Sequence, residues 1–270
     1  MLRLLLLLLV SIGVSATAAV GKAPYPSTRL TAVAGEVEAP CPADALMIVG
    51  AGQSNAGNHL TGRLSVRADI PAYMMLDGRC YLIHDPVLGS TRDKKGATYH
   101  GSLWSRVAQR LAVRLGRPVV VLTSGLGGYS SADWLADVWG ARTWLENQIS
   151  ASPLVPRHVV WIHGESDAIA GTAEALYGRR ISLLFDVLSA RAPGARFWIS
   201  MESRCGSAIS AAVRRGQSGL TNSRHDTWLI GNLDALGPGY RRPDACHFNG
   251  AGASRVATLI ADAIAAEELR

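Results

Sequence analysis

The chain has 270 residues, which is enough for one substantial α/β domain and short for two. Hydrophobic residues make up 48% and charged residues 18%, so we expect a packed core without structural metal and exclude an intrinsically disordered chain. The formal net charge is +6, but the basic residues are scattered and the aromatic residues (6%) do not interleave with them. Nucleic acid is therefore not an expected partner, and a helix carrying Arg106, Arg110 and Arg114 is interpreted as a solvated face. Weak attraction to acidic glycans or membrane surfaces stays open.

The first 19 residues have the pattern of a secretory signal peptide. Arg3 precedes the apolar run Leu4–Val14, and small residues follow around the A-x-A step of Ala16 and Ala18. The alternative is an uncleaved membrane anchor, but the apolar run is short for a bilayer. We expect residues 1–19 to be a signal peptide and residues 20–270 a single domain. The mature protein is then secreted or periplasmic, with no stable membrane insertion.

Export indicates that the four cysteines form disulfides, because disulfides persist in oxidising compartments. Cys41, Cys80, Cys205 and Cys246 permit three pairings, and their spacing lacks the paired C-x-x-C clusters of a zinc site. We favour Cys41–Cys80 and Cys205–Cys246, because each pair joins segments that we expect to be neighbours. Four buried free thiols are the alternative.

Beyond an extended, proline-bearing lead-in, short apolar runs alternate with helical patterns. The expected strands are 46–50, 81–84, 119–123, 158–163 and 196–201, with a short edge strand at 227–230. The expected helices are 102–115, 139–149, 173–190, 208–215 and 252–269. Such alternation predicts a three-layer α/β/α fold with a parallel central sheet. Ligands of such sheets bind beyond the carboxyl ends of the strands, so candidate residues should follow the strands.

The first strand is followed directly by the segment Gly50 to Asn55, which contains Ser54. A serine on a glycine-bracketed turn can present its hydroxyl at the edge of the sheet, with backbone amides free to face an anion. The alternative is that Ser54 only caps the next helix.

The third and fourth strands end in segments of the same kind. Ser124 to Tyr129 is rich in glycine, which lets a backbone approach a ligand, although a tight turn explains it equally well. Beyond the fourth strand lie His163, Glu165 and Asp167, whose spacing is not that of a zinc site, and no metal is expected. We expect the two carboxylates to hold the shape of the cleft.

The last segment, Pro243 to Gly250, brings Asp244 and His247 into one loop ahead of the C-terminal helix. This spacing can place the carboxylate on the imidazole Nδ1–H and leave Nε2 to take a proton from a serine. Alternatively, Asp244 caps the helix, although Asn249 and Gly250 can do so instead.

These four segments, in this order, resemble the SGNH hydrolase superfamily, in its branch of sialate O-acetylesterases and acetylxylan esterases. Gly52 to Asn55 resembles the nucleophile block, and Gly127 with Gly128 the glycine block. Trp161 to Asp167 resembles the W-x-Q-G-E-x-D block, and Asp244 to His247 the terminal one. The resemblance implies a flavodoxin-like, five-stranded parallel sheet and hydrolysis of acyl esters without a cofactor.

The resemblance also implies residue roles. Ser54 is the nucleophile, His247 its base, and Asp244 orients His247. The oxyanion hole consists of the amides of Ser54 and Gly127 and a side-chain donor, for which this chain has His163 where the branch has glutamine. If the N–H of His163 points elsewhere, a donor is missing, which costs about 10²–10³ in rate; His163 as core packing is a third possibility. The expected substrate-binding residues are Gln53, Asn55, Tyr129 and Glu165.

The leading functional hypothesis is hydrolysis of O-acetyl esters on a carbohydrate, with an acetylated glycan or another small acyl ester as substrate. Acyl transfer to a glycan and a carbohydrate-binding homologue with weak catalysis are the alternatives. The connections 56–79 and 87–101 are long enough to wall a substrate cleft. Aromatic side chains that could stack on a sugar, or simply pack, are Tyr99, His100, Tyr129 and Trp134.

Overall fold

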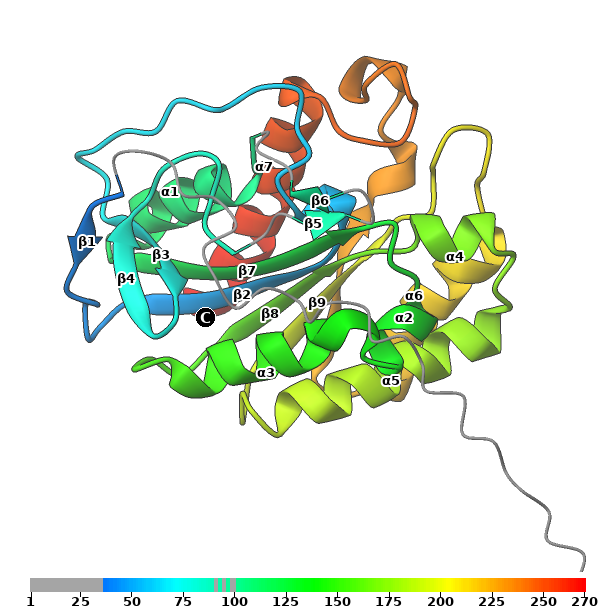
Figure 1. Ribbon diagram of the computed structural model, residues 1–270, viewed down its shortest axis with the longest axis horizontal. Coiled ribbons are helices and arrows are strands. Elements are labelled where there is room, and N and C mark those ends of the chain that lie inside the picture. The colour runs from blue at the N-terminus through cyan, green and yellow to red at the C-terminus, as the bar shows by residue number, and fades with distance from the viewer. Residues whose placement is uncertain (1–35, 90–91, 94–95, 98–100) are drawn as a thin grey trace, which may run out of the picture.

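The computed structural model describes residues 36–89, 92–93, 96–97 and 101–270. One sheet crosses the molecule and is covered on both faces by helices (Figure 1). Helices α1 (Trp104–Leu115) and α7 (Gly250–Glu268) pack together on one face. The other face carries α3 (Ala141–Ala151), α5 (Glu174–Ser189) and α6 (Ala211–Ser223). The expected three-layer α/β/α architecture is confirmed.

The centre of the sheet is parallel, as predicted. Its strands lie in the order β3 (Ala72–Leu76), β7 (Val119–Gly127), β2 (Leu46–Gln53), β8 (His158–Ile162), β9 (Arg196–Met201) and β10 (Thr227–Asn232). Every residue of β2, β7 and β8 is buried, because helices cover both of their faces, and this explains their continuous apolar sequences.

The second predicted strand, 81–84, was expected in the parallel sheet, and this prediction is wrong. The corresponding strand β4 (Arg79–Leu82) runs antiparallel to β3, a strand that was not predicted. The continuous run from β3 to β10 in the described sheet therefore has six parallel strands rather than five. Strands β3 and β4 form a hairpin through Asp77 and Gly78, both with positive φ (50° and 73°). An Asp-Gly pair is a strong hairpin signal, and it was available in the sequence. Strand β1 (Glu38–Ala39) extends this edge antiparallel to β4.

The five predicted helices are present with shifted ends, and α6 continues eight residues beyond the predicted Arg215, to Ser223. Two short helices were not predicted, α2 (Ser131–Leu135) and α4 (Glu165–Ile169). They follow the carboxyl ends of β7 and β8, where sequence analysis expected loops. The short strands β5 (Arg92–Asp93) and β6 (Gly96–Ala97) pair with each other, and β5 also pairs with the end of β7.

Both predicted disulfides are present. Cys41–Cys80 links the segment before β2 to β4, with the Cα atoms 5.1 Å apart. Cys205–Cys246 links the segment after β9 to the segment before α7, with a Cα separation of 3.9 Å. In the described part of the chain, no helix has the length and apolar character needed to cross a bilayer. The predicted signal peptide, 1–19, lies outside the described residues.

Candidate active site

A pocket of about 290 Å³ lies beyond the carboxyl ends of β2, β7 and β8. Its walls come from the four segments that sequence analysis singled out: Gln53 and Ser54, Gly127 and Gly128, Glu165 and Ser166, and His247. Parallel strands end at a common edge of the sheet, so segments more than a hundred residues apart meet there. The disulfide Cys205–Cys246 and the side chain of Ile169 complete the lining.

Ser54 begins a single 3₁₀ turn (Ser54–Ala56) directly after β2. The backbone can make this turn because Gly52 has a φ of +142° and sits so close to β8 that a Cβ would lie 1.9 Å from the Ile162 carbonyl. The Ser54 side chain is 4% exposed and does not cap the turn. Within the described residues its Oγ makes no hydrogen bond, so the hydroxyl is available to the pocket.

Asp244 and His247 form the predicted contact in the loop before α7. The His247 Nδ1 lies 2.8 Å from Asp244 Oδ2, and the amides of Cys246 and His247 donate to Oδ1 at 2.9 and 3.0 Å. Burial works to raise the pKa of Asp244, but these hydrogen bonds outweigh it and lower the pKa to about 2. The ionised carboxylate holds the proton on Nδ1, which leaves Nε2 as an acceptor on the side of the pocket.

His59 stacks on His247, with ring centroids 5.4 Å apart and planes 10° from parallel. It lines the same pocket and comes from the segment that follows the nucleophile turn. Sequence analysis did not select His59, and its position in the sequence offered no signal. The stacking limits rotation of the His247 ring, which its bond to Asp244 already orients.

Asn55 ties the turn of Ser54 to the loop of Asp244 and His247, the candidate catalytic loop. Its Nδ2 lies 2.7 Å from Glu165 Oε1, 2.9 Å from Glu202 Oε1 and 3.2 Å from the Cys246 carbonyl. Its Oδ1 accepts from the Phe248 amide at 3.1 Å. Asn55 is 2% exposed and does not line the pocket, so the structure moves it from the expected substrate-binding set to the support of the loop.

Glu165 and Glu202 form a buried layer below the pocket, both 0% exposed. Burial raises the pKa of Glu165 to about 7 against the hydrogen bond from Asn55, and burial together with Glu165 raises the pKa of Glu202. The nearest guanidinium, that of Arg241, is 3.9 Å from Glu202 Oε1 and 3.8 Å from Asp234 Oδ1. Sequence analysis missed Glu202, although it directly follows β9 and the strand-end rule would have found it.

The expected oxyanion role of His163 is contradicted by its geometry. The side chain is 0% exposed and does not line the pocket. Its Nε2 lies 3.1 Å from the Tyr129 carbonyl, which can only accept, so Nε2 carries the proton and Nδ1 accepts from the Tyr177 hydroxyl at 3.2 Å. Burial lowers the pKa of His163, which favours this neutral form. The only N–H of the ring is therefore committed away from the pocket.

Gln53 offers the side-chain donor that His163 does not. Its Oε1 accepts from the amides of Gly164 and Ser166, each at 3.3 Å, which fixes the orientation of the side-chain amide. Its Nε2 has no hydrogen-bond partner within the described residues, and Gln53 lines the pocket. Gly127 and Gly128 line the same pocket, and Gly128 has a positive φ of 73°. The side chain of Gln53 and these two glycines therefore line the same pocket as Ser54.

Comparison with solved structures identifies the fold of this chain. No family model matches the chain, and no curated protein matches it. A solved protein of Arabidopsis thaliana is similar over 83% of this chain and 98% of its own length, at 18% identity and a TM-score of 0.62. A lipase/acylhydrolase from Enterococcus faecalis covers 83% of this chain and 96% of its own, at 14% identity and a TM-score of 0.52. This chain has the SGNH hydrolase fold.

A carbohydrate acetylesterase from Xanthomonas citri shares the SGNH fold with this chain. The similarity covers 82% of this chain and 55% of that one, at 16% identity and a TM-score of 0.53.

Asp167 and Tyr129 both stabilise the scaffold around the pocket. Asp167 accepts from the amide and hydroxyl of Ser131 at 2.7 and 2.6 Å, which joins α4 to the start of α2. Tyr129, expected to bind substrate, is 0% exposed and donates its hydroxyl to the Val138 carbonyl. Trp134 is equally buried and packs on Tyr129, so neither ring can stack on a sugar. Tyr99 and His100 lie outside the described residues.

Proposed function

We propose that this protein is a serine esterase that hydrolyses O-acetyl esters of a carbohydrate. The observation that carries the proposal is the meeting of Ser54 with the Asp244–His247 pair in one pocket, with the carboxylate on Nδ1 and Nε2 left to act as base. The proposed nucleophile, base and orienting acid come from opposite ends of the chain, and a serine, a histidine and a carboxylate in these roles are what acyl transfer to serine requires.

The reaction begins when His247 Nε2 takes the proton of the Ser54 hydroxyl and Oγ attacks the ester carbonyl. The oxyanion that forms is held by the amides of Ser54 and Gly127 and by Gln53 Nε2. His247 then gives its proton to the departing sugar oxygen, which leaves an acetyl ester on Ser54. Water, deprotonated by His247, releases acetate. Asp244 stays ionised and stabilises the imidazolium in both halves of the reaction.

The size of the pocket supports a short acyl group. Its volume of about 290 Å³ is at the lower end for ligand pockets, and Ile169 and the Cys205–Cys246 bridge stand in its wall. The carbohydrate is suggested by the Xanthomonas citri acetylesterase with the same fold. Among the described residues that line the pocket, none favours transfer to a sugar acceptor over hydrolysis, so water is the proposed acceptor.

The test uses Ser54→Ala with Ser166→Ala as its matched control, because both serines line the pocket. We expect Ser54→Ala to lower kcat/KM on p-nitrophenyl acetate by about 10⁴-fold or more, since the nucleophile is removed outright. Ser166→Ala should stay within about tenfold of the wild type, because its hydroxyl has no step in the reaction. A serine-directed phosphonate should label Ser54. Acetate release from acetylated xylan, acetylated sialic acid and acetylated galacturonan then identifies the carbohydrate. Undiminished hydrolysis by Ser54→Ala would refute the proposal.

A further inference from the structure

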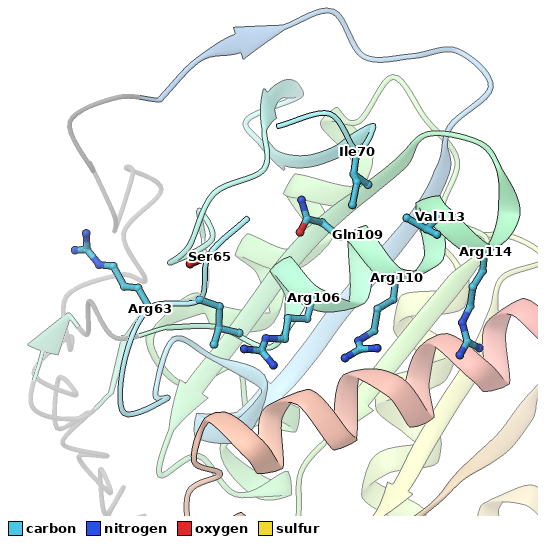
Figure 2. A pocket seen from close by; sticks show the side chains of 9 residues that line it. Arg63, Ser65, Ile70, Arg106, Gln109, Arg110, Val113 and Arg114 are labelled. Carbon is cyan, nitrogen blue, oxygen red and sulfur yellow. The ribbon is translucent and has the colours of Figure 1, made fainter. Parts of the chain in front are cut away.

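Three arginines form a row along α1 on the face of the molecule that α7 shares. Arg106, Arg110 and Arg114 follow one another at intervals of four residues, so they lie on one side of the helix with an axial rise of about 6 Å between neighbours. Figure 2 shows their side chains extending together from α1 toward α7. Contacts with α7 agree: Arg110 donates to Ser254 Oγ at 3.0 Å, and Arg114 pairs with Asp262.

The positive charge of this row is poorly neutralised. Arg63 lines the same hollow as Arg106. Within the described residues, the side chains of Arg106 and Arg63 make no hydrogen bond or ion pair. The partner of Arg110 is a neutral hydroxyl, so of the three only Arg114 has an ion pair with a carboxylate. Asp85 attracts both Arg106 and Arg63, so its single charge is shared between two guanidinium groups, and its oxygens also accept from the amides of Leu64 and Ser102 at 2.5 and 2.7 Å. Aligned like charges destabilise a helix, so an arrangement of this kind favours an anionic ligand.

A hollow of about 560 Å³ adjoins the row, roughly twice the size of the candidate active site. It lies between α1 and the segment 63–70. Ile70 and Val113 give it apolar surface, and Ser65 and Gln109 give it polar groups, as Figure 2 shows. Apolar, hydrogen-bonding and arginine residues thus line one hollow.

The segment that walls the hollow is continuous with the candidate active site. Residue 59 of the same segment is the histidine that stacks on His247 in the pocket. Leu60 then donates its amide to the Gly101 carbonyl, three residues before α1 begins. The pocket and the hollow are thus joined by a short stretch of chain, residues 59–63.

We propose that the arginine row and its hollow bind the carboxylate groups of an acidic polysaccharide whose acetylated sugar occupies the pocket of Ser54. This inference rests on the proposed function and specifies its substrate class as an acetylated glycan that contains uronic acid. Guanidinium groups match carboxylates in bidentate geometry, and the sugar rings supply C–H faces for Ile70 and Val113 and hydroxyls for Gln109. Duplex or single-stranded nucleic acid is a poorer fit, because no aromatic residue is among those that line the hollow in the described part of the chain. A membrane surface is a poorer fit because the site is concave.

The binding test follows the fluorescence anisotropy of a labelled oligogalacturonate with full-length protein. Arg106→Gln/Arg110→Gln should weaken binding by about tenfold or more, because two charge-assisted hydrogen bonds are lost. The control, Arg179→Gln/Arg215→Gln, removes the same charge from α5 and α6 on the opposite face and should stay within about twofold, because these positions are beyond the range of screened charges. Raising the salt to about 1 M, where the Debye length is ~3 Å, should reduce the difference between the two variants. Circular dichroism checks that both variants fold, and Arg110→Gln alone replaces the first pair if that pair does not.

Three results would overturn the inference. One is equal affinity of the wild type and Arg106→Gln/Arg110→Gln for the oligogalacturonate. Another is equally tight binding of a neutral xylo-oligosaccharide. The third is tighter binding of duplex DNA or of phosphatidylserine vesicles that the same substitutions abolish, since the site would then serve a different class of anion.

Kinetics separate this inference from the proposed function. On acetylated galacturonan, Arg106→Gln/Arg110→Gln should raise KM and leave kcat unchanged, while hydrolysis of p-nitrophenyl acetate stays at the wild-type rate. A wild type without any esterase activity refutes the proposed function, and the anisotropy test still decides on the arginine row. An active wild type whose KM on galacturonan is unaffected by the substitutions refutes the arginine row alone.

Discussion

The catalytic loop and the buried layer below it both contain carboxyl groups, and the two regions hold them in opposite states. Asp244 has 37% of its side chain exposed and receives three N–H donors, so its pKa falls to about 2. Glu165 and Glu202 are fully buried and share the single amide group of Asn55, so burial raises the pKa of both. The number of donors and access to water together decide the charge. Asp244 in the loop therefore keeps its negative charge, whereas burial favours the neutral form of the carboxyl groups in the layer.

The largest effect in this comparison should come from removing the charge of the loop. Asp244→Asn keeps the shape of the side chain but loses the ionised acceptor that holds the His247 proton on Nδ1. We expect kcat for p-nitrophenyl acetate to fall by about 10³–10⁴-fold. Glu202→Gln is the matched control in the buried layer, and its kcat should change by less than about tenfold, because burial favours the neutral form of this carboxyl group, which the amide resembles. Equal losses in the two variants would mean that both carboxyl groups act through their charge.

The next effect distinguishes Gln53 from His163 as the oxyanion donor. Gln53→Glu keeps the oxygen that accepts from Gly164 and Ser166 but replaces the free donor by a second acceptor. We expect kcat to fall by about 10²–10³-fold with little change in KM. His163→Gln, which restores the residue of the resembled block, should change kcat by less than about tenfold, because the side chain faces the Tyr129 carbonyl. The reverse order of effects would return the oxyanion role to position 163.

Gln53 and His163 also show which features of the site could be predicted from the sequence and which could not. The alternation of apolar runs with helical patterns predicted the layers and the parallel sheet, and the four blocks predicted which segments surround the pocket, because strand ends are encoded locally in apolar runs and glycines. The blocks did not predict which atoms of Gln53 and His163 face the pocket, because orientation depends on partners such as Tyr177 and the Gly164 amide. The hairpin of β3 and β4 was missed for a different reason, since its Asp77-Gly78 signal was present but not used.

A smaller effect should come from the disulfide that anchors the catalytic loop. Cys205–Cys246 and Cys41–Cys80 close chain segments of similar length, with sequence separations of 41 and 39, so each should contribute about 2–4 kcal/mol to the free energy of unfolding. Cys205→Ser/Cys246→Ser should in addition lower kcat, by about tenfold, because Cys246 lies between Asp244 and His247. The matched variant Cys41→Ser/Cys80→Ser should lose stability without losing kcat. Thermal unfolding and hydrolysis of p-nitrophenyl acetate measure the two quantities, and unchanged kcat in the first variant would mean that packing alone holds the loop.

Glu165→Gln should have the smallest effect on activity. The pH dependence of its free energy of unfolding is the most direct test of whether burial keeps this carboxyl group neutral. Below pH 4.5 the carboxyl group of Glu165 is protonated in both the folded and the unfolded chain. Between pH 4.5 and about 7 the unfolded chain releases the proton while the folded chain keeps it, so the free energy of unfolding of the wild type falls as pH rises. Glu165 faces Asn55, Glu202, Asp234 and Arg241, and the variant keeps these groups together with the oxygen that accepts from Asn55. Urea unfolding should therefore show Glu165→Gln gaining on the wild type by ~1–3 kcal/mol across this interval and no further above it. Parallel pH profiles of the two proteins would show that Glu165 ionises as it does in water, and the contrast with Asp244 would then lie in position alone.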